Sequence, residues 1–228
     1  GVTISNSVKK IGDHAFNCCK QLTDLIISDS VTEIGQNAFG YCESLKSVAI
    51  SNTVTKIGSG VFGYCTSLDR VLIPNSVTDI GISAFYACTS LKTVVIPDSV
   101  KKIDFAAFEM CSELSEIEIP DSVKSIDRSA FSYCKKLARI KISSSATSIG
   151  ESAFPDYEII GHVHIPADTI ASDYAGKYGL PSDTSIFFYD DTCQDCSCPF
   201  RTQSKAEKPV DPSSLNNNTG TNLSLIHI

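Results

Sequence analysis

A 23-residue internal repeat constrains the fold of this chain more than any other feature of its sequence. Phenylalanine recurs at that interval without a slip, at Phe16, Phe39, Phe62, Phe85, Phe108, Phe131 and Phe154. Cysteine recurs three residues later, at Cys19, Cys42, Cys65, Cys88, Cys111 and Cys134. A fixed period in the twenties is typical of a solenoid, in which each unit packs only on its neighbours. This is not the pattern of an ordinary globular enzyme core.

The first half of each repeat predicts a short strand with one buried face. In the segment 91–96, Val94 and Ile96 share a face because side chains alternate along a strand. Pro97 and Asp98 follow and should end the strand, because proline lacks the N–H that a sheet needs and aspartate favours turns. Stacked repeats should therefore form a parallel sheet.

The second half of each repeat predicts one helical or 3₁₀ turn. Phe85 and Cys88 are three residues apart, which is a helical spacing, and glycine or aspartate stands ahead of them in every repeat, as at Gly81. Both residue types cap helices and tolerate positive φ. We therefore expect an α/β solenoid whose phenylalanine and cysteine columns point into a shared core.

The repeat reads L-x-x-[LVI]-x-[IL]-[PS]-x-[ST]-V-x-x-I-[GD]-x-x-[AV]-F-x-x-C-x-x, and this pattern resembles the leucine-rich repeats of BspA-like surface proteins across residues 1–154. The resemblance implies a leucine-rich-repeat horseshoe with its parallel sheet on the concave face and the short helical turns on the convex side. It also implies a non-enzymatic module of a secreted or cell-surface protein that adheres to host or matrix proteins.

Decay of the repeat divides the chain into three parts. Residues 1–165 predict a solenoid of seven units, and the first unit begins inside a strand, so we expect an N-terminally truncated solenoid. Residues 166–189 predict a C-terminal capping helix, ending near Gly179, and a strand behind it. Residues 190–228 are polar and aperiodic, and we expect them to be disordered.

Outward-pointing strand positions provide the candidate protein-binding surface. They form two columns, and the candidate residues in them are Asp24, Ile26, Ala49, Arg70, Leu72, Thr93, Val95, Glu116, Glu118, Arg139 and Lys141. One column is aliphatic at its first four positions and charged beyond them. An outward aliphatic strip with polar neighbours is typical of a protein-binding patch. Strand propensity alone explains the same residues equally well.

The sequence predicts no catalytic residue, cofactor or metal. The cysteine column favours reduced, packed thiols over disulfides, because parallel Cβ vectors are poorly placed for bridging. A zinc site needs a fourth ligand beside Cys193, Cys196 and Cys198, and the sequence offers none nearby. The second candidate is the pair His162 and His164, which share a strand face but have no third metal ligand beside them. A net charge of -7 disfavours nucleic acid, and the chain has no apolar run long enough to cross a membrane.

Two classes of function remain open from the sequence. The resemblance favours an extracellular or surface-attached adhesion module, with which the glycosylation sequons at Asn217 and Asn222 are compatible. An intracellular, cytoplasmic protein-interaction scaffold would suit the unpaired thiols better. In both classes the partner is a protein.

Overall fold

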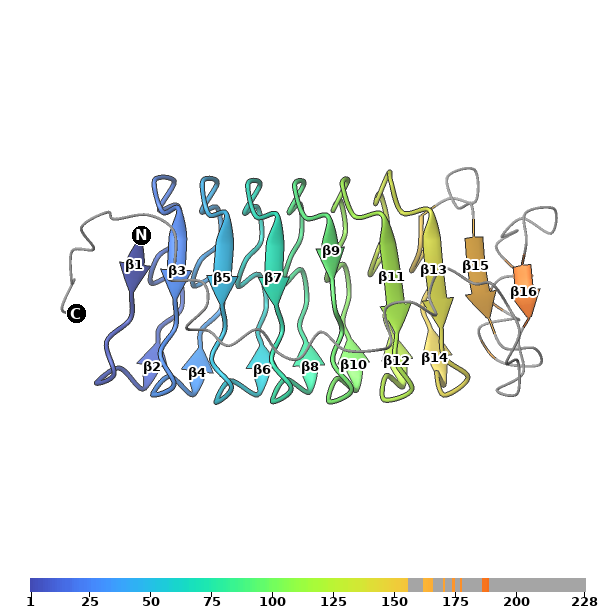
Figure 1. Ribbon diagram of the computed structural model, residues 1–228, viewed down its shortest axis with the longest axis horizontal. Helices are drawn as coiled ribbons and strands as arrows, with labels where there is room; N and C mark the ends of the chain where they lie inside the picture. Colours follow the sequence, from blue (N-terminus) through green and yellow to red (C-terminus); the bar gives the residue numbers. More distant parts are fainter. Residues whose placement is uncertain (156–161, 166–169, 171–173, 175–176, 178–185, 189–228) are drawn as a thin grey trace, which may run out of the picture.

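The computed structural model describes residues 1–155, 162–165, 170, 174, 177 and 186–188. In the first of these ranges the chain winds into parallel coils, one for each 23-residue repeat, and the longer strands lie side by side in chain order (Figure 1). Each coil has three sides, which we call the long strand, the short strand and the turn segment. The long strands are β1 (Val2–Thr3), β3 (Asp24–Ile26), β5 (Ser47–Ala49), β7 (Arg70–Leu72), β9 (Thr93–Val94), β11 (Glu116–Ile119), β13 (Arg139–Ile142), β15 (His162–Ile165) and β16 (Ile186–Phe188). The short strands are β2 (Lys10–Ile11), β4 (Glu33–Ile34), β6 (Lys56–Ile57), β8 (Asp79–Ile80), β10 (Lys102–Ile103), β12 (Ser125–Ile126) and β14 (Ser148–Ile149).

Every strand pair is parallel, and pairing between successive repeats has a register of 23 residues. Long strands form the sheets β1-β3-β5-β7-β9 and β11-β13-β15-β16, and short strands form the sheets β2-β4 and β14-β12-β10-β8-β6. Leu25 lies opposite Val48, Val48 opposite Val71, and Val71 opposite Val94. Each column of the sequence repeat is therefore a ladder in space, and the predicted parallel solenoid is confirmed.

The predicted helical turns are wrong, because the turn segments of the described residues contain no helix. Every second amide donates to the carbonyl three residues back, at 3.1–3.2 Å, as at Ala84, Tyr86 and Cys88. The amides between them donate instead to the next repeat, at 2.8–2.9 Å, as at Ser83, Phe85 and Ala87. The turn segment thus combines tight turns with bonds to the neighbouring coil.

Left-handed backbone at two positions in each turn segment prevents a helix there. Ser83 and Ala87 have φ values of 52° and 55°, and the same two positions are left-handed throughout the solenoid from His14 to Tyr133. An α-helix needs negative φ at every residue. The three-residue spacing of Phe85 and Cys88 therefore reflects consecutive turns, whose remaining amides are satisfied by the next coil.

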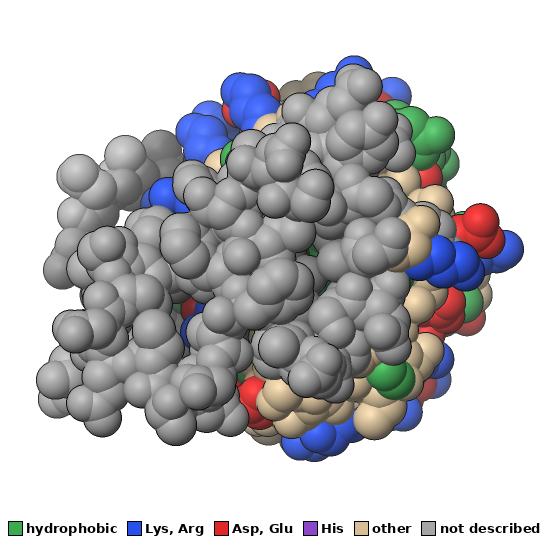
Figure 2. Space-filling model, turned by 90° about the vertical axis from the view of Figure 1, so that its right-hand side faces the viewer, with side chains coloured by type: hydrophobic (Ala, Val, Ile, Leu, Met, Phe, Trp, Pro, Cys, Tyr) green, Lys and Arg blue, Asp and Glu red, His purple; other side chains and the backbone are tan. Residues whose placement is uncertain are grey.

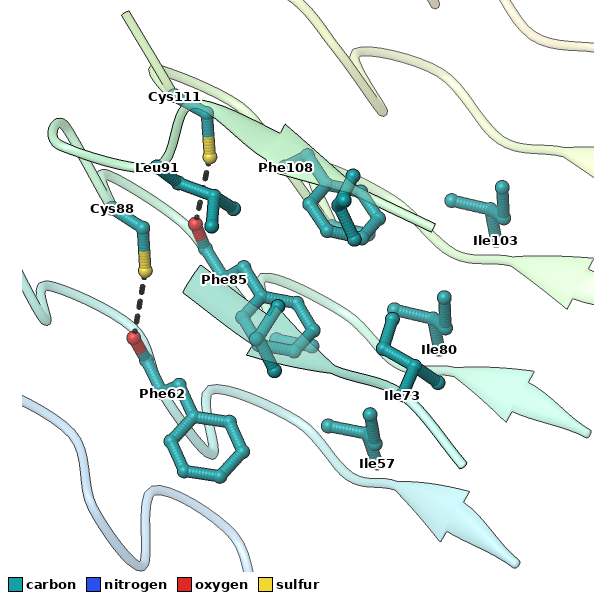
Figure 3. Close-up of a cluster of buried hydrophobic side chains, with 14 of the residues drawn as sticks. Ile57, Phe62, Ile73, Ile80, Phe85, Cys88, Leu91, Ile103, Phe108 and Cys111 are labelled. Carbon is teal, nitrogen blue, oxygen red and sulfur yellow. Dashed lines mark hydrogen bonds between the residues drawn. The ribbon is translucent and has the colours of Figure 1, made fainter. Parts of the chain in front are cut away.

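The core is a continuous stack of phenylalanine rings. Consecutive rings from Phe16 to Phe154 have centroids 5.1–5.7 Å apart and planes within 16° of each other. Beside the rings, each thiol from Cys42 to Cys134 donates to a phenylalanine carbonyl of the preceding repeat at 3.2–3.3 Å, as Figure 3 shows for Cys88 and Cys111. The phenylalanines from Phe39 to Phe131 are completely buried.

The first repeat departs from the predicted core. Cys19 is exposed and Phe16 is only partly buried. The later phenylalanines and cysteines are covered by the coil that precedes their own. In the described structure no such coil covers Phe16 and Cys19. The assignment of Cys19 to the core is therefore wrong.

At the other end, an aromatic contact closes the phenylalanine stack. Ile170, Tyr174 and Lys177 have helical backbone, and Tyr174 is buried with its ring edge-on to Phe154 at a centroid distance of 6.0 Å. The rest of the predicted capping helix lies outside the described residues, as does the tail from residue 190. The cap therefore stays a prediction.

Candidate protein-binding face

The outward surface of the long strands, which we call the long-strand face, brings the candidate site residues together. Asp24 lies opposite Ser47, Ser47 opposite Arg70, and Arg70 opposite Thr93. The second column keeps the same register from Ile26 onward. Since the strands are parallel at a constant offset, both predicted columns are continuous over these repeats.

Four aliphatic side chains form a strip on this face: Ile26, Ala49, Leu72 and Val95. Ala49 is half-buried, whereas Ile26, Leu72 and Val95 expose 44%, 45% and 73% of their surface. The strand residues between them point into the core, where Leu25 and Val71 expose 3% or less. The aliphatic strip is thus turned toward solvent by strand alternation.

Two ion pairs occupy the same face beyond the aliphatic strip. Arg139 contacts Glu116 at 2.6 Å and Lys141 contacts Glu118 at 2.5 Å, each across one step of the sheet. Partly exposed pairs of this kind contribute about 0–1 kcal/mol to stability. In the column that holds Glu116 and Arg139, the earlier charges Asp24 and Arg70 make no ion pair or side-chain hydrogen bond within the described residues.

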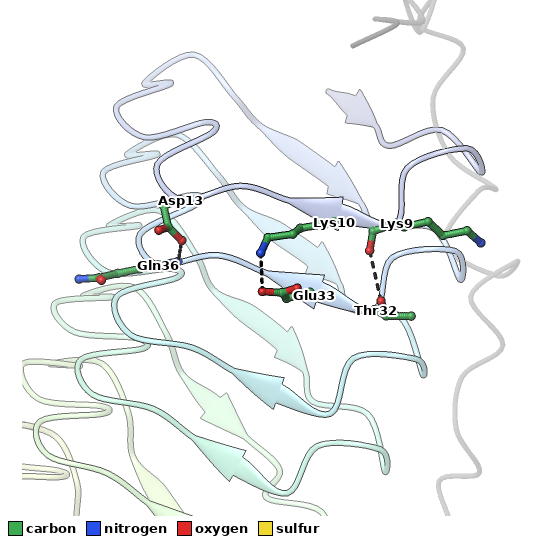
Figure 4. Close-up of polar contacts among 6 residues, drawn as sticks. All are labelled: Lys9, Lys10, Asp13, Thr32, Glu33 and Gln36. Carbon is green, nitrogen blue, oxygen red and sulfur yellow. Dashed lines mark hydrogen bonds and ion pairs between the residues drawn. The ribbon is translucent and has the colours of Figure 1, made fainter.

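The short strands carry polar contacts that the sequence analysis missed. Lys10 pairs with Glu33 at 2.7 Å and Lys56 with Asp79 at 3.5 Å. Figure 4 shows the first pair beside a hydrogen bond of 2.8 Å that the backbone N–H of Gln36 donates to the Asp13 carboxylate. The sequence could have predicted these ion pairs, because lysine and acidic residues alternate at the 23-residue step from Lys10 to Asp79. Charges of both signs also appear around the edge of the surface in Figure 2, outside the grey residues.

A row of exposed aromatic side chains on the turn segments was also missed. Tyr41, Tyr64 and Tyr133 occupy one column, two residues after the phenylalanine, and expose 41%, 38% and 62% of their surface. The spacing alone could have identified them. Their left-handed backbone could not be anticipated, since tyrosine rarely adopts positive φ.

The described residues hold no obvious catalytic or metal chemistry. They contain no group of three potential metal ligands. Among them no helix is long and apolar enough to cross a membrane. The sequence-predicted histidine pair belongs to β15, where His162 lies opposite Arg139 and His164 opposite Lys141.

The cysteine column is a packing feature. All seven cysteines of the described residues are free thiols, and the five from Cys42 to Cys134 are buried, as predicted for reduced, packed thiols. Burial raises the pKa of Cys88 to about 12 and that of Cys134 to about 12. The cause is the loss of solvation that a thiolate suffers inside the core.

Alkylation at pH 8 is expected to separate these thiols into two classes. The exposed Cys18 and Cys19 should react rapidly, whereas Cys88 and Cys134 should stay unmodified until the protein is denatured, because the thiolate is the reacting form. Timed labelling followed by peptide mass mapping measures each site. Rapid labelling of Cys88 in the folded protein would contradict its place in the core.

The same thiols predict alkaline destabilisation. Their folded-state pKa lies above the ordinary value of 9.0, so the stability that the neutral thiols contribute is complete below pH 9.0. It should be lost as the pH rises from 9.0 toward about 12. Urea unfolding at a series of alkaline pH values measures the loss. A Cys88→Ala variant should show a weaker dependence on pH.

Comparison with known proteins identifies the repeat. The family model described as BspA type Leucine rich repeat region matches residues 1–114 and 55–175, with six copies in all. The chain belongs to the BspA-type leucine-rich repeat family. Members of leucine-rich repeat families are generally protein-interaction modules and typically non-enzymatic. No curated protein sequence matches the chain.

Solved structures of bacterial leucine-rich repeat proteins are similar to this chain in fold. A T. pallidum leucine-rich repeat protein is 29% identical, with a TM-score of 0.60 over 68% of this chain and 78% of that one. A Bacteroides ovatus leucine-rich repeat protein is 24% identical, with a TM-score of 0.54 over 74% of this chain and 58% of that one. A Eubacterium ventriosum protein is 26% identical, with a TM-score of 0.54 over 65% of this chain and 36% of that one. This chain therefore spans little more than half of the Bacteroides ovatus protein and about a third of the Eubacterium ventriosum protein.

Proposed function

We propose that this BspA-type solenoid is a non-enzymatic adhesion module of a secreted or cell-surface protein, and that it binds host or matrix proteins through the aliphatic strip. The observation that carries the proposal is the exposed aliphatic strip. Ile26 of β3 and Leu72 of β7 lie in register through Ala49 of β5, and Val95, directly after β9, is exposed as well. Adhesion and location are inferred from the family resemblance of the repeat.

Burial of the aliphatic strip would supply the binding energy. Removing a Leu, Ile or Val side chain completely from water is worth about 1.5–3 kcal/mol. The β-sheet holds these side chains in register, so little conformational entropy is lost when a partner covers them. Among the described residues the flanking charges of Asp24 and Arg70 have no ion-pair partner, which leaves them available to orient an incoming surface.

Charged substitutions on the strip test the proposal. The double change Leu72→Asp and Val95→Asp should weaken binding to an immobilised matrix protein by at least about 100-fold, since each side chain acts as a central contact of about 2 kcal/mol or more. Surface plasmon resonance on collagen, laminin, fibronectin and fibrinogen measures the effect.

The matched control is Ile82→Asp. Ile82 is aliphatic and 48% exposed, close to the 45% of Leu72, but it lies on a turn segment. This variant should bind as the parent does. Equal binding by the strip variant and the parent would place the site elsewhere, and absence of parent binding to the whole panel would remove the adhesion proposal.

The second candidate is an intracellular protein-interaction scaffold. The free thiols favour it, because secreted proteins usually pair their cysteines. A scaffold would use the same aliphatic strip on a cytoplasmic protein. Fractionation of the source cells with an antibody to this chain separates the two candidates directly.

A further inference from the structure

Three tyrosines from successive repeats form a continuous aromatic surface on the turn segments. The rings of Tyr41 and Tyr64 stack at a centroid distance of 4.4 Å with planes 9° apart. Tyr86 comes from the neighbouring column and packs on Tyr64 at 5.1 Å, tilted by 53°. Its hydroxyl donates to the sulfur of Met110 at 3.1 Å. These contacts hold the three rings in place, while Tyr41 and Tyr64 stay exposed and Tyr86 is half-buried.

A groove of about 210 Å³ runs beside these rings. Besides the tyrosines it is lined by Asn37, Ser83 and two glycines. Gly60 has a φ of 63°, and a Cβ there would come within 1.9 Å of the Asn37 amide oxygen, so the Asn37 side chain lies against bare backbone. That side chain makes no hydrogen bond within the described residues. The groove thus combines aromatic surface with the Asn37 amide and the Ser83 hydroxyl, neither of which has a side-chain hydrogen bond within the described residues.

A carboxylate stands in the repeat next to Tyr86, which lines the groove. Glu109 follows Tyr86 by one repeat in the same column. Burial is the main cause that raises the pKa of Tyr64, and Tyr86 and the Glu109 charge raise it further. Burial raises the pKa of Glu109 itself, yet it has no ion pair or side-chain hydrogen bond within the described part of the chain. A carboxylate that loses solvation without gaining a cation is destabilised in its charged form. A cationic ligand would compensate for that loss.

We propose that this groove binds an arginine or lysine side chain of a partner protein, with the cation beside the tyrosine rings and paired to Glu109. Cations are attracted to aromatic faces, and arginine most often makes this contact. The chain already does so internally, because the Arg128 guanidinium lies 4.9 Å from the centroid of the Phe105 ring, one repeat away on the turn segments. The net charge of -7 also favours a basic partner.

This site is independent of the aliphatic strip. A neutral sugar would stack on tyrosine and use the Asn37 amide equally well, but it would leave the Glu109 carboxylate uncompensated. The groove therefore fits a basic peptide segment better than a neutral glycan.

Peptide binding to the intact chain tests the site. The probe is the peptide acetyl-Gly-Arg-Gly-amide, compared with the same peptide carrying citrulline, which keeps the shape of arginine without its charge. Three of the eight tyrosines line the groove and the chain has no tryptophan, so the change in tyrosine fluorescence on peptide addition measures binding. The arginine peptide should bind at least about tenfold more tightly than the citrulline peptide, and Glu109→Gln should remove most of that difference.

Two further variants test whether the peptide binds in the groove and whether the loss of any carboxylate weakens binding. Gly63→Asn should fill the groove and abolish binding without unfolding the chain, because Asn17 occupies the same column in the first repeat. Asp98→Asn removes an exposed carboxylate from the turn that follows β9, outside both proposed sites, and should bind the peptide as the parent does. Thermal unfolding confirms that each variant is folded.

Three results would overturn the proposal. They are equal affinity for the arginine and citrulline peptides, undiminished binding by Glu109→Gln, and the absence of binding at millimolar arginine peptide. Binding of maltoheptaose in place of the peptide would identify a carbohydrate site. None of these results bears on the aliphatic strip, which the Leu72→Asp and Val95→Asp variant tests separately.

Discussion

Replacement of Phe85 by alanine is expected to lower the free energy of unfolding by about 3–5 kcal/mol. Phe85 is completely buried in the middle of the solenoid, and its ring stacks on Phe62 at 5.5 Å and on Phe108 at 5.1 Å. The variant loses the burial of the ring and leaves a cavity. Two aromatic contacts, each worth about 0.5–1.5 kcal/mol, are lost as well. Urea unfolding followed by circular dichroism measures the change.

The control for this prediction is Tyr133→Ala. Tyr133 lies on the turn segment of a later repeat and exposes 62% of its surface. Exposed substitutions usually change stability by about 0.5 kcal/mol or less, so this variant should unfold close to the parent. A loss as large as that of Phe85→Ala would mean that the phenylalanine stack is not the principal stabilising element.

The change Val71→Asp is expected to prevent folding, whereas Leu72→Asp should leave the fold intact. The two residues are neighbours on β7, but Val71 exposes 3% of its surface and Leu72 exposes 45%. Aspartate at 71 would place a carboxylate in the core without a cation, which costs several kcal/mol even after the pKa shifts. Circular dichroism and size-exclusion chromatography of the two variants give the comparison.

This pair also validates the binding test on the long-strand face. If Leu72→Asp unfolded the protein as Val71→Asp should, a loss of partner binding could not be assigned to the aliphatic strip. Similar stability of the two variants would show that the strand does not alternate between core and solvent as described.

The sequence by itself determined the solenoid and its ladders. A strict period makes each column of side chains meet its own copy one coil away, because identical units can stack only in identical register. Val48, Val71 and Val94 therefore had to align, and strand alternation then placed Leu72 on the outer surface. The outward columns and the inward phenylalanines follow from this reasoning alone.

Tertiary structure decided the conformation of the turn segments. The spacing of Phe85 and Cys88 suits a helix, but a helix would use its amides internally. In the solenoid the amide of Phe85 donates to Ala107 of the next coil instead. Left-handed residues on either side, Ser83 and Ala87, turn the alternate amides outward to make those bonds. The bonds exist only between stacked coils, so no local sequence signal could reveal them.

Tertiary structure also decided which side chains meet across columns. The packing of Tyr86 on Tyr64 joins two different columns of the repeat, and the exposure of Cys19 depends on what lies beside the first coil. Periodicity predicts contacts within a column, because the same residue type returns at the same height. Periodicity does not predict contacts between columns, because these depend on the direction of each side chain. It does not predict burial at the ends of the stack either, because the repeat does not specify what lies beside the end coils.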